Sequence, residues 1–179
     1  MVQKTTGTIY PLYALRAVIL QAQRLTHPTT PQTPPSPDQI VELVKALGYL
    51  QIDTLNVVNR AHYFTLWSRF GSYDIHALDK LLYNPGQRRL YEGWGHAACI
   101  LPLEHYRYHR WRTIPDYAAW VNKDGSRELT AQTLARIRAE GALRGGDFLD
   151  DEQKGGQWYD WKPSKMALEV LFASGDLMV

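Results

Sequence analysis

The feature that most constrains the fold is a series of helix-length segments in which apolar residues recur every three or four positions. The clearest one follows the proline-rich stretch 28–37. Ser36 suits a helix N-cap and Pro37 the first helical position, while Gln39 stands where its side chain can complete a capping box. An apolar face follows, made of Ile40, Leu43, Val44 and Leu47. This pattern predicts a helix that begins at Pro37 and ends at Gly48.

Comparable spacing predicts further helices over 12–25 and 57–70, from Asp74, over 130–141, and from Pro163. The helix over 12–25 is strongly apolar, so we expect it to lie in the core. Thr130 is the expected N-cap of the helix over 130–141. The last helix should end at Gly175, with its inward face formed by Leu168, Leu171 and Phe172.

Short strands are predicted between these helices. The segment Leu50–Thr54 alternates apolar and polar side chains, and segments 88–94 and 96–101 flank Gly95 as the two arms of a β-hairpin. A winged-helix domain has this order: helices come first, and a hairpin that can serve as a wing follows them. The predicted fold is therefore mainly α with short β-hairpins.

We expect two winged-helix units in tandem, one over residues 1–125 and a second over 126–179. The final residues, Asp176–Val179, have the pattern of a strand. A strand with no partner after it is an unusual place for a domain to end. We therefore expect the second unit to be incomplete, truncated at its wing.

Charge and cysteine content narrow the function classes. The formal net charge is only +2, but residues 60–112 carry eight basic and four acidic side chains, whereas 113–179 carry eight and eleven. Local positive charge of this kind favours a polyanionic partner. The single cysteine, Cys99, excludes an internal disulfide and fits a reducing cytoplasm. The most apolar N-terminal stretch contains Arg16 and is too short to span a bilayer, so we expect no membrane contact.

Neither a metal site nor a nucleotide cofactor is expected. The six histidines show no metal-ligand spacing, and neither a GxGxxG motif nor a P-loop occurs. Glu92 and His96, four residues apart at the predicted hairpin, could lie near a substrate or could be paired surface groups.

Gln51 and Asp53 are the first candidates for chemistry. In an extended segment, residues two apart project from the same face, so an amide and a carboxylate would point at one spot. Taken alone, this pattern is more often the polar face of a half-buried strand.

Aromatic and basic residues alternate over 106–112. Guanidinium groups can hold phosphates while rings stack on bases or pack the domain. A helix with an aromatic core face and a solvated basic face explains the pattern equally well. The candidate phosphate contacts across the chain are Arg60, Arg69, Arg107, Arg110, Arg112, Lys162 and Lys165.

Several blocks resemble, in order and with plausible spacing, the YcaQ/AlkZ family of winged-helix DNA glycosylases. They are Leu50–Thr54, Val57–Tyr63, Trp67–Gly71, Arg89–Ala98, Leu101–Glu104, Lys162–Glu169 and Gly175–Val179. The proline-rich stretch 28–37 looks like an insertion, and the family's remaining winged-helix and β-barrel portions are absent. The glutamine-aliphatic-aspartate motif resembles the YcaQ branch.

This resemblance implies an enzyme that hydrolyses the N-glycosidic bond of N7-alkylated purines in double-stranded DNA, and that could unhook interstrand crosslinks. It implies that Asp53 stabilises an oxocarbenium-like sugar and activates water, and that Gln51 orients that water. We expect a cytoplasmic monomer. The alternatives are a non-catalytic winged-helix DNA-binding protein and an inactive fragment.

Overall fold

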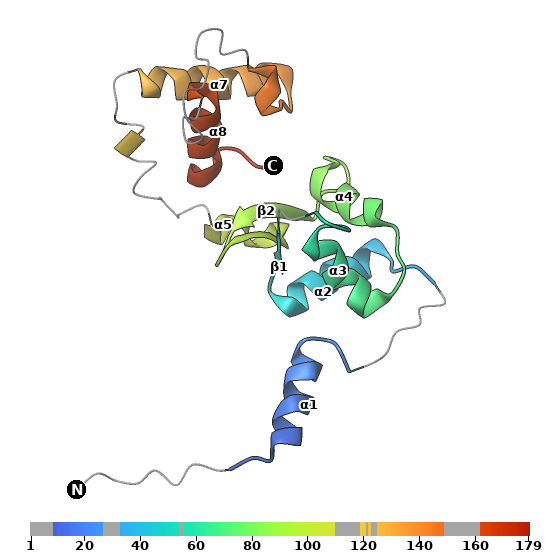
Figure 1. Cartoon of the computed structure of the whole chain (residues 1–179). Helices are drawn as coiled ribbons and strands as arrows, with labels where there is room; N and C mark the ends of the chain where they lie inside the picture. The colour runs from blue at the N-terminus through green and yellow to red at the C-terminus, as the bar shows by residue number, and fades with distance from the viewer. Residues whose placement is uncertain are drawn as a thin grey trace, which may run out of the picture.

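The computed structural model of the chain describes residues 9–26, 33–53, 56–109, 119–120, 122, 125–148 and 162–179. The described part is mainly helical with one small antiparallel sheet, so the predicted fold class is confirmed (Figure 1). Arg110 and Arg112 lie outside the described residues.

Helix α2 (Pro37–Leu47) forms as its local sequence dictates. The Ser36 hydroxyl accepts a hydrogen bond from the Gln39 backbone N–H at 3.3 Å, and the Gln39 side chain accepts one from the Ser36 N–H at 2.8 Å. This reciprocal pair satisfies two backbone donors that the first helical turn leaves free. Gly48 follows with φ +87°, a conformation that favours glycine. Both predicted ends of this helix are confirmed.

Two more helices complete the first group. Helix α3 (Ala61–Phe70) begins four residues later than predicted, because Arg60 is extended and residues 57–59 form bends. Helix α4 (Ile75–Tyr83) begins as predicted, since the Asp74 carboxylate accepts a hydrogen bond from the His76 N–H at 3.0 Å.

The sheet consists of β1 (Leu50–Gln51), β2 (Leu90–Trp94) and β3 (Ala98–Pro102), in the order β1-β3-β2 with both pairs antiparallel. The predicted hairpin around Gly95 is confirmed, and the Gly95 N–H donates to the Ala97 carbonyl at 2.9 Å. Strand β1 is shorter than predicted.

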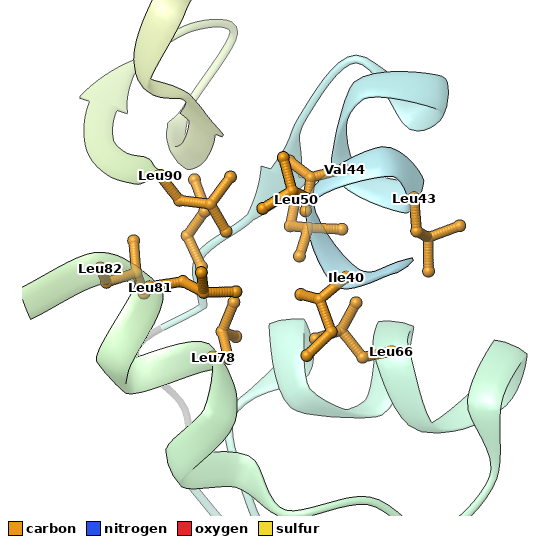
Figure 2. Packing of buried hydrophobic residues seen from close by; sticks show 11 residues of the cluster. Ile40, Leu43, Val44, Leu50, Leu66, Leu78, Leu81, Leu82 and Leu90 are labelled. Carbon is orange, nitrogen blue, oxygen red and sulfur yellow. The ribbon is translucent and has the colours of Figure 1, made fainter. Parts of the chain in front are cut away.

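The main core lies between one face of this sheet and helices α2, α3 and α4. Figure 2 shows the side chains converging from these elements. The buried members are Ile40, Val41, Leu43, Val44, Leu50, Leu66, Leu78, Leu81, Leu82, Leu90 and Ile100. The inward direction predicted for Leu78, Leu81 and Leu82 is confirmed.

A smaller core covers the other face of the sheet. Tyr91, Cys99 and Leu101 form it, and residues from η1 (Leu103–His105), α5 (Tyr106–His109) and the end of the chain pack against it. The Tyr106 hydroxyl donates to the Gly175 carbonyl at 2.5 Å, and Met178 packs against the cluster. The last residues of the chain therefore lie on this face.

The C-terminal helices differ from the predictions in detail. Helix α7 (Ser126–Glu140) has Gly125 in its N-cap position, so the predicted N-cap at Thr130 is wrong. The Thr130 hydroxyl instead donates to the Ser126 carbonyl inside the helix at 2.7 Å. A 3₁₀ turn, η2 (Gly145–Asp147), follows.

Helix α8 (Pro163–Ser174) begins and ends where predicted, but of the three residues predicted to face inward only Leu171 is fully buried. Its buried residues are Ser164, Ala167, Val170 and Leu171, while Leu168 and Phe172 are half-buried. Small residues line this face because α8 packs closely on α7, which buries Ser126 and Thr133. The predicted final strand is not formed, since the Leu177 N–H donates to the Leu171 carbonyl and closes α8 instead.

Helix α1 (Leu12–Ala22) is not the core helix that its composition predicted, because none of its residues is buried. Its spacing identified an apolar face but could not show what would cover that face. The Arg69 guanidinium of α3 donates a hydrogen bond to the Gln23 carbonyl at 3.1 Å and so contacts the end of this helix.

His62 makes folding stability depend on pH. Its side chain is 4% exposed, and burial lowers its pKa, with the charge of Arg60 acting in the same direction and Asp79 opposing. The unfolded chain therefore binds more protons near and below pH 6.5, so stability should decrease as the pH falls through that value.

We expect urea unfolding at pH 7.5 and pH 5.5 to show this loss in the parent chain and a smaller loss in His62→Phe. His76→Gln is the matched control because the His76 side chain is 72% exposed. Equal acid sensitivity in the parent and in His62→Phe would contradict the role of His62.

Candidate functional site

Gln51 is the last residue of strand β1, and Asp53 follows two residues later, just beyond the strand. Gln51 pairs with Cys99 of β3, which in turn pairs with Gly93 of β2. The Ile52 N–H donates to the Ala98 carbonyl at 2.8 Å, so the ladder continues one residue past Gln51. Alternation along the extended chain then places Asp53 on the same side as Gln51. Gln51 is exposed and Asp53 is half-buried.

The cross-strand neighbours of Gln51 are small: Cys99 in β3 and, beyond it, Gly93 in β2. A Cβ at Gly93 would lie 2.8 Å from the Tyr91 ring, and a Cβ at Gly95 would lie 3.0 Å from the Cys99 sulfur. Both glycines are therefore required by the close packing of the hairpin itself. The Tyr91 ring and the Leu101 side chain therefore fill the space over Gly93.

The Cys99 thiol is part of this packing. It is 0% exposed, and its sulfur donates to the Gly93 carbonyl at 3.5 Å. A buried, hydrogen-bonded thiol of this kind acts as a small structural residue.

Tyr91 and Tyr106 cover another part of the sheet face that carries Gln51. Their rings meet edge to face with centroids 5.1 Å apart. Burial raises the pKa of Tyr91, so it stays neutral at physiological pH. The end of the chain, which Tyr106 holds through the Gly175 carbonyl, is thus anchored on the face that carries Gln51.

Glu92 lies on the opposite face from Gln51. It pairs with Ile100, which pairs with Leu50, and these two belong to the main core. The Tyr83 hydroxyl donates to the Glu92 carboxylate. Burial raises the pKa of Tyr83, and this hydrogen bond raises it further. The structure therefore does not bring Glu92 to the side of Gln51 and Asp53.

His96 is exposed in the turn between β2 and β3. Asp53 follows Ile52, whose N–H bonds to Ala98, so Asp53 and the turn of the hairpin lie at the same end of the sheet. His96 therefore lies at the end of the sheet where Asp53 is, whereas Glu92 lies on the opposite face from Gln51.

The candidate phosphate contacts have different surroundings. Arg60 is exposed at the start of α3, and the exposed Arg107 guanidinium lies 4.7 Å over the Tyr108 ring. Arg69 instead binds the Gln23 and Thr65 carbonyls, and burial lowers its pKa. Lys162 and Lys165 are exposed at the start of α8.

Sequence reasoning missed a small basic pocket of about 340 Å³ between α2 and the sheet. Lys45, Arg88 and Arg89 line it together with Glu104. Arg89 forms an ion pair with Asp38, and Lys45 forms pairs with Glu42 and Glu104. The adjacent pair Arg88-Arg89 was the sequence signal that could have pointed to it.

Among the described residues, no group of three or more histidine, cysteine, aspartate or glutamate side chains could hold a metal ion. No helix in that part of the chain is long and apolar enough to cross a membrane.

The arrangement suits a reaction at a centre that becomes positively charged. A carboxylate stabilises a developing cation, and an amide beside it can both donate and accept hydrogen bonds to a water molecule. Gln51 ends β1 and Asp53 follows two residues later, and neither task needs a cofactor.

Comparison with known proteins identifies the family of the chain. The model of the family described as DNA glycosylase AlkZ-like matches residues 44–179, which is most of the chain and includes Gln51 and Asp53. No solved structure matches the chain. The chain therefore belongs to the AlkZ-like DNA glycosylase family.

Proposed function

We propose that the chain is a DNA repair glycosylase that hydrolyses the N-glycosidic bond of N7-alkylated purines in double-stranded DNA, with Asp53 and Gln51 as its catalytic residues. The observations that support this proposal are the pairing of Gln51 with Cys99 and the hydrogen bond from Ile52 to Ala98, because alternation along this chain predicts that the Gln51 and Asp53 side chains share one sheet face, inside the region that matches the family. We propose that it acts as a monomer in the cytoplasm, with winged-helix units over 1–125 and 126–179 and the β2–β3 hairpin as the first wing.

The chemistry follows from the substrate. Alkylation at N7 gives the purine a positive charge, so the base leaves with the electrons of the C1′–N9 bond and needs little acid catalysis. The sugar is left as an oxocarbenium ion, which the Asp53 carboxylate stabilises electrostatically. Gln51 holds a water molecule that adds to C1′, and Asp53 takes the proton that this water loses and passes it to solvent.

Crosslinked purines fit the same scheme. A link between the N7 atoms of two purines leaves each base cationic, so hydrolysis at one sugar frees one strand. The proposed reaction at a crosslink therefore requires no residue beyond those used for a simple N7-alkyl lesion.

The charge of Asp53 is the first test. We expect Asp53→Asn to slow the release of N7-methylguanine from duplex DNA by about 10²–10³-fold, because it removes one preorganised charge while retaining size and polarity. Gln51→Ala should slow release less, since a second water can partly replace the amide. Single-turnover rates measure both effects.

Asp176→Asn is the matched control for this test, because Asp176 is an exposed aspartate that bonds to Ser174 at the end of α8. It should excise at the parental rate. A folded Asp53→Asn variant that binds DNA and excises as fast as the parent would rule out the catalytic role.

The phosphate contacts predict a salt dependence. Replacing the exposed Arg60 and Arg107 by glutamine should weaken DNA binding and lower the slope of log K against log salt by about 1 for each arginine. Arg136→Gln is the control, because Arg136 is paired with Glu140 and also bonds to the Asp147 carbonyl. Fluorescence anisotropy across a salt series gives the slopes, and an equal effect of all three replacements would argue against specific contacts.

A further inference from the structure

Two valines in the segment between β1 and α3 are almost fully exposed. Val57 is 92% exposed and Val58 is 83% exposed. Apolar β-branched side chains in water are unfavourable, and nothing in the local backbone requires valine there. Both residues had been expected in the helix, but α3 begins only at Ala61.

The segment that carries these valines is supported on both sides. The Asn59 side chain accepts a hydrogen bond from the Arg60 N–H at 2.8 Å. Helix α3 then begins and is anchored in the core by Leu66, which is 0% exposed. Before the segment, the Ile52 N–H is bonded to the Ala98 carbonyl of the central strand. Valine has few rotamers, so Val57 and Val58, which we call the tip, present two stiff apolar side chains.

The tip is also close to the proposed catalytic motif. Val57 stands four residues after Asp53, so their Cα atoms are at most about 14 Å apart. Arg60, which is exposed, follows Val58 by two residues. The Asp53 carboxylate, the two valines and the Arg60 guanidinium therefore follow one another within a stretch of eight residues.

We propose that Val57 and Val58 form a wedge that inserts into the base stack next to the lesion, while Arg60 holds a neighbouring phosphate. This inference rests on the proposed glycosylase function. A glycosylase that extrudes its target nucleotide leaves a gap in the duplex, and apolar side chains inserted at a base step are a common way to open and fill such a gap. The wedge lowers the energy of the extruded state without touching the reacting bond.

The duplex is a better occupant of this surface than a protein partner. The exposed apolar area comes from two adjacent side chains, which suits a single base step, and the exposed residues on either side of them are Asn56 and Arg60. Positive charge next to an apolar tip complements a stack of bases flanked by phosphates.

The test compares a paired lesion with one that needs no extrusion. We expect Val57→Ser with Val58→Ser to slow excision of N7-methylguanine from duplex DNA by about tenfold or more, because unstacking is no longer assisted. On the same oligonucleotide as a single strand, the double variant should stay within about threefold of the parent, since that base is already accessible. Val18→Ser on α1, also at an exposed valine, should change neither rate.

A second readout requires no chemistry. With 2-aminopurine beside the lesion in the duplex, the parent should raise the fluorescence on binding as the stack opens, and the double variant should not. An equal loss on duplex and single strand, or an unchanged fluorescence response, would overturn the wedge. If the parent excises neither substrate, the proposed function fails, whereas the fluorescence comparison still decides the role of the valines.

Discussion

The pairing of β3 with both of its neighbours is the constraint on which the rest of the structure depends. This central strand fixes β1 on one side and β2 on the other, so the register of three short strands is set by one element. Because side chains alternate along a strand, that register also decides which residues enter the main core and which face the other side. A slip of one residue would exchange Leu50 with Gln51.

The proposed site is a direct consequence of this alternation. Leu50 and Ile52 secure the strand to the main core, and the residues between and after them are thereby turned to the opposite face. The hydrogen bond from the Ile52 N–H to the Ala98 carbonyl holds Ile52 in place and so positions the backbone that leads into Asp53. On that face the hairpin carries glycine and cysteine next to Gln51, and Tyr106 ties down the end of the chain. Core packing and site geometry are thus set by the same hydrogen-bonded ladder.

Local signals in the sequence were sufficient for much of the fold. The ends of α2 were predictable because Ser36, Gln39 and Gly48 act on their own helix. The start of α3 was not, since Val57 and Val58 have the apolar character of core residues and their exposure depends on the surrounding fold. The buried face of α8 was misjudged for a related reason, because small residues lie inward where α7 approaches closely. For the site, the alternation of Gln51 and Asp53 indicated a shared face, but only the cross-strand register shows that Glu92 lies on the other side.

We propose that the Asp53 carboxylate stabilises positive charge on the sugar. The most direct test is binding of the chain to two duplexes that carry an abasic analogue, one a cationic pyrrolidine and the other a neutral tetrahydrofuran of similar shape. We expect the parent to prefer the cationic analogue by about 100-fold or more, since analogues of a transition state bind far more tightly than ground-state mimics. Asp53→Asn should lose most of that preference while binding the neutral duplex as the parent does. An equal affinity of the parent for both duplexes, or a preference that Asp53→Asn retains, would contradict the claim.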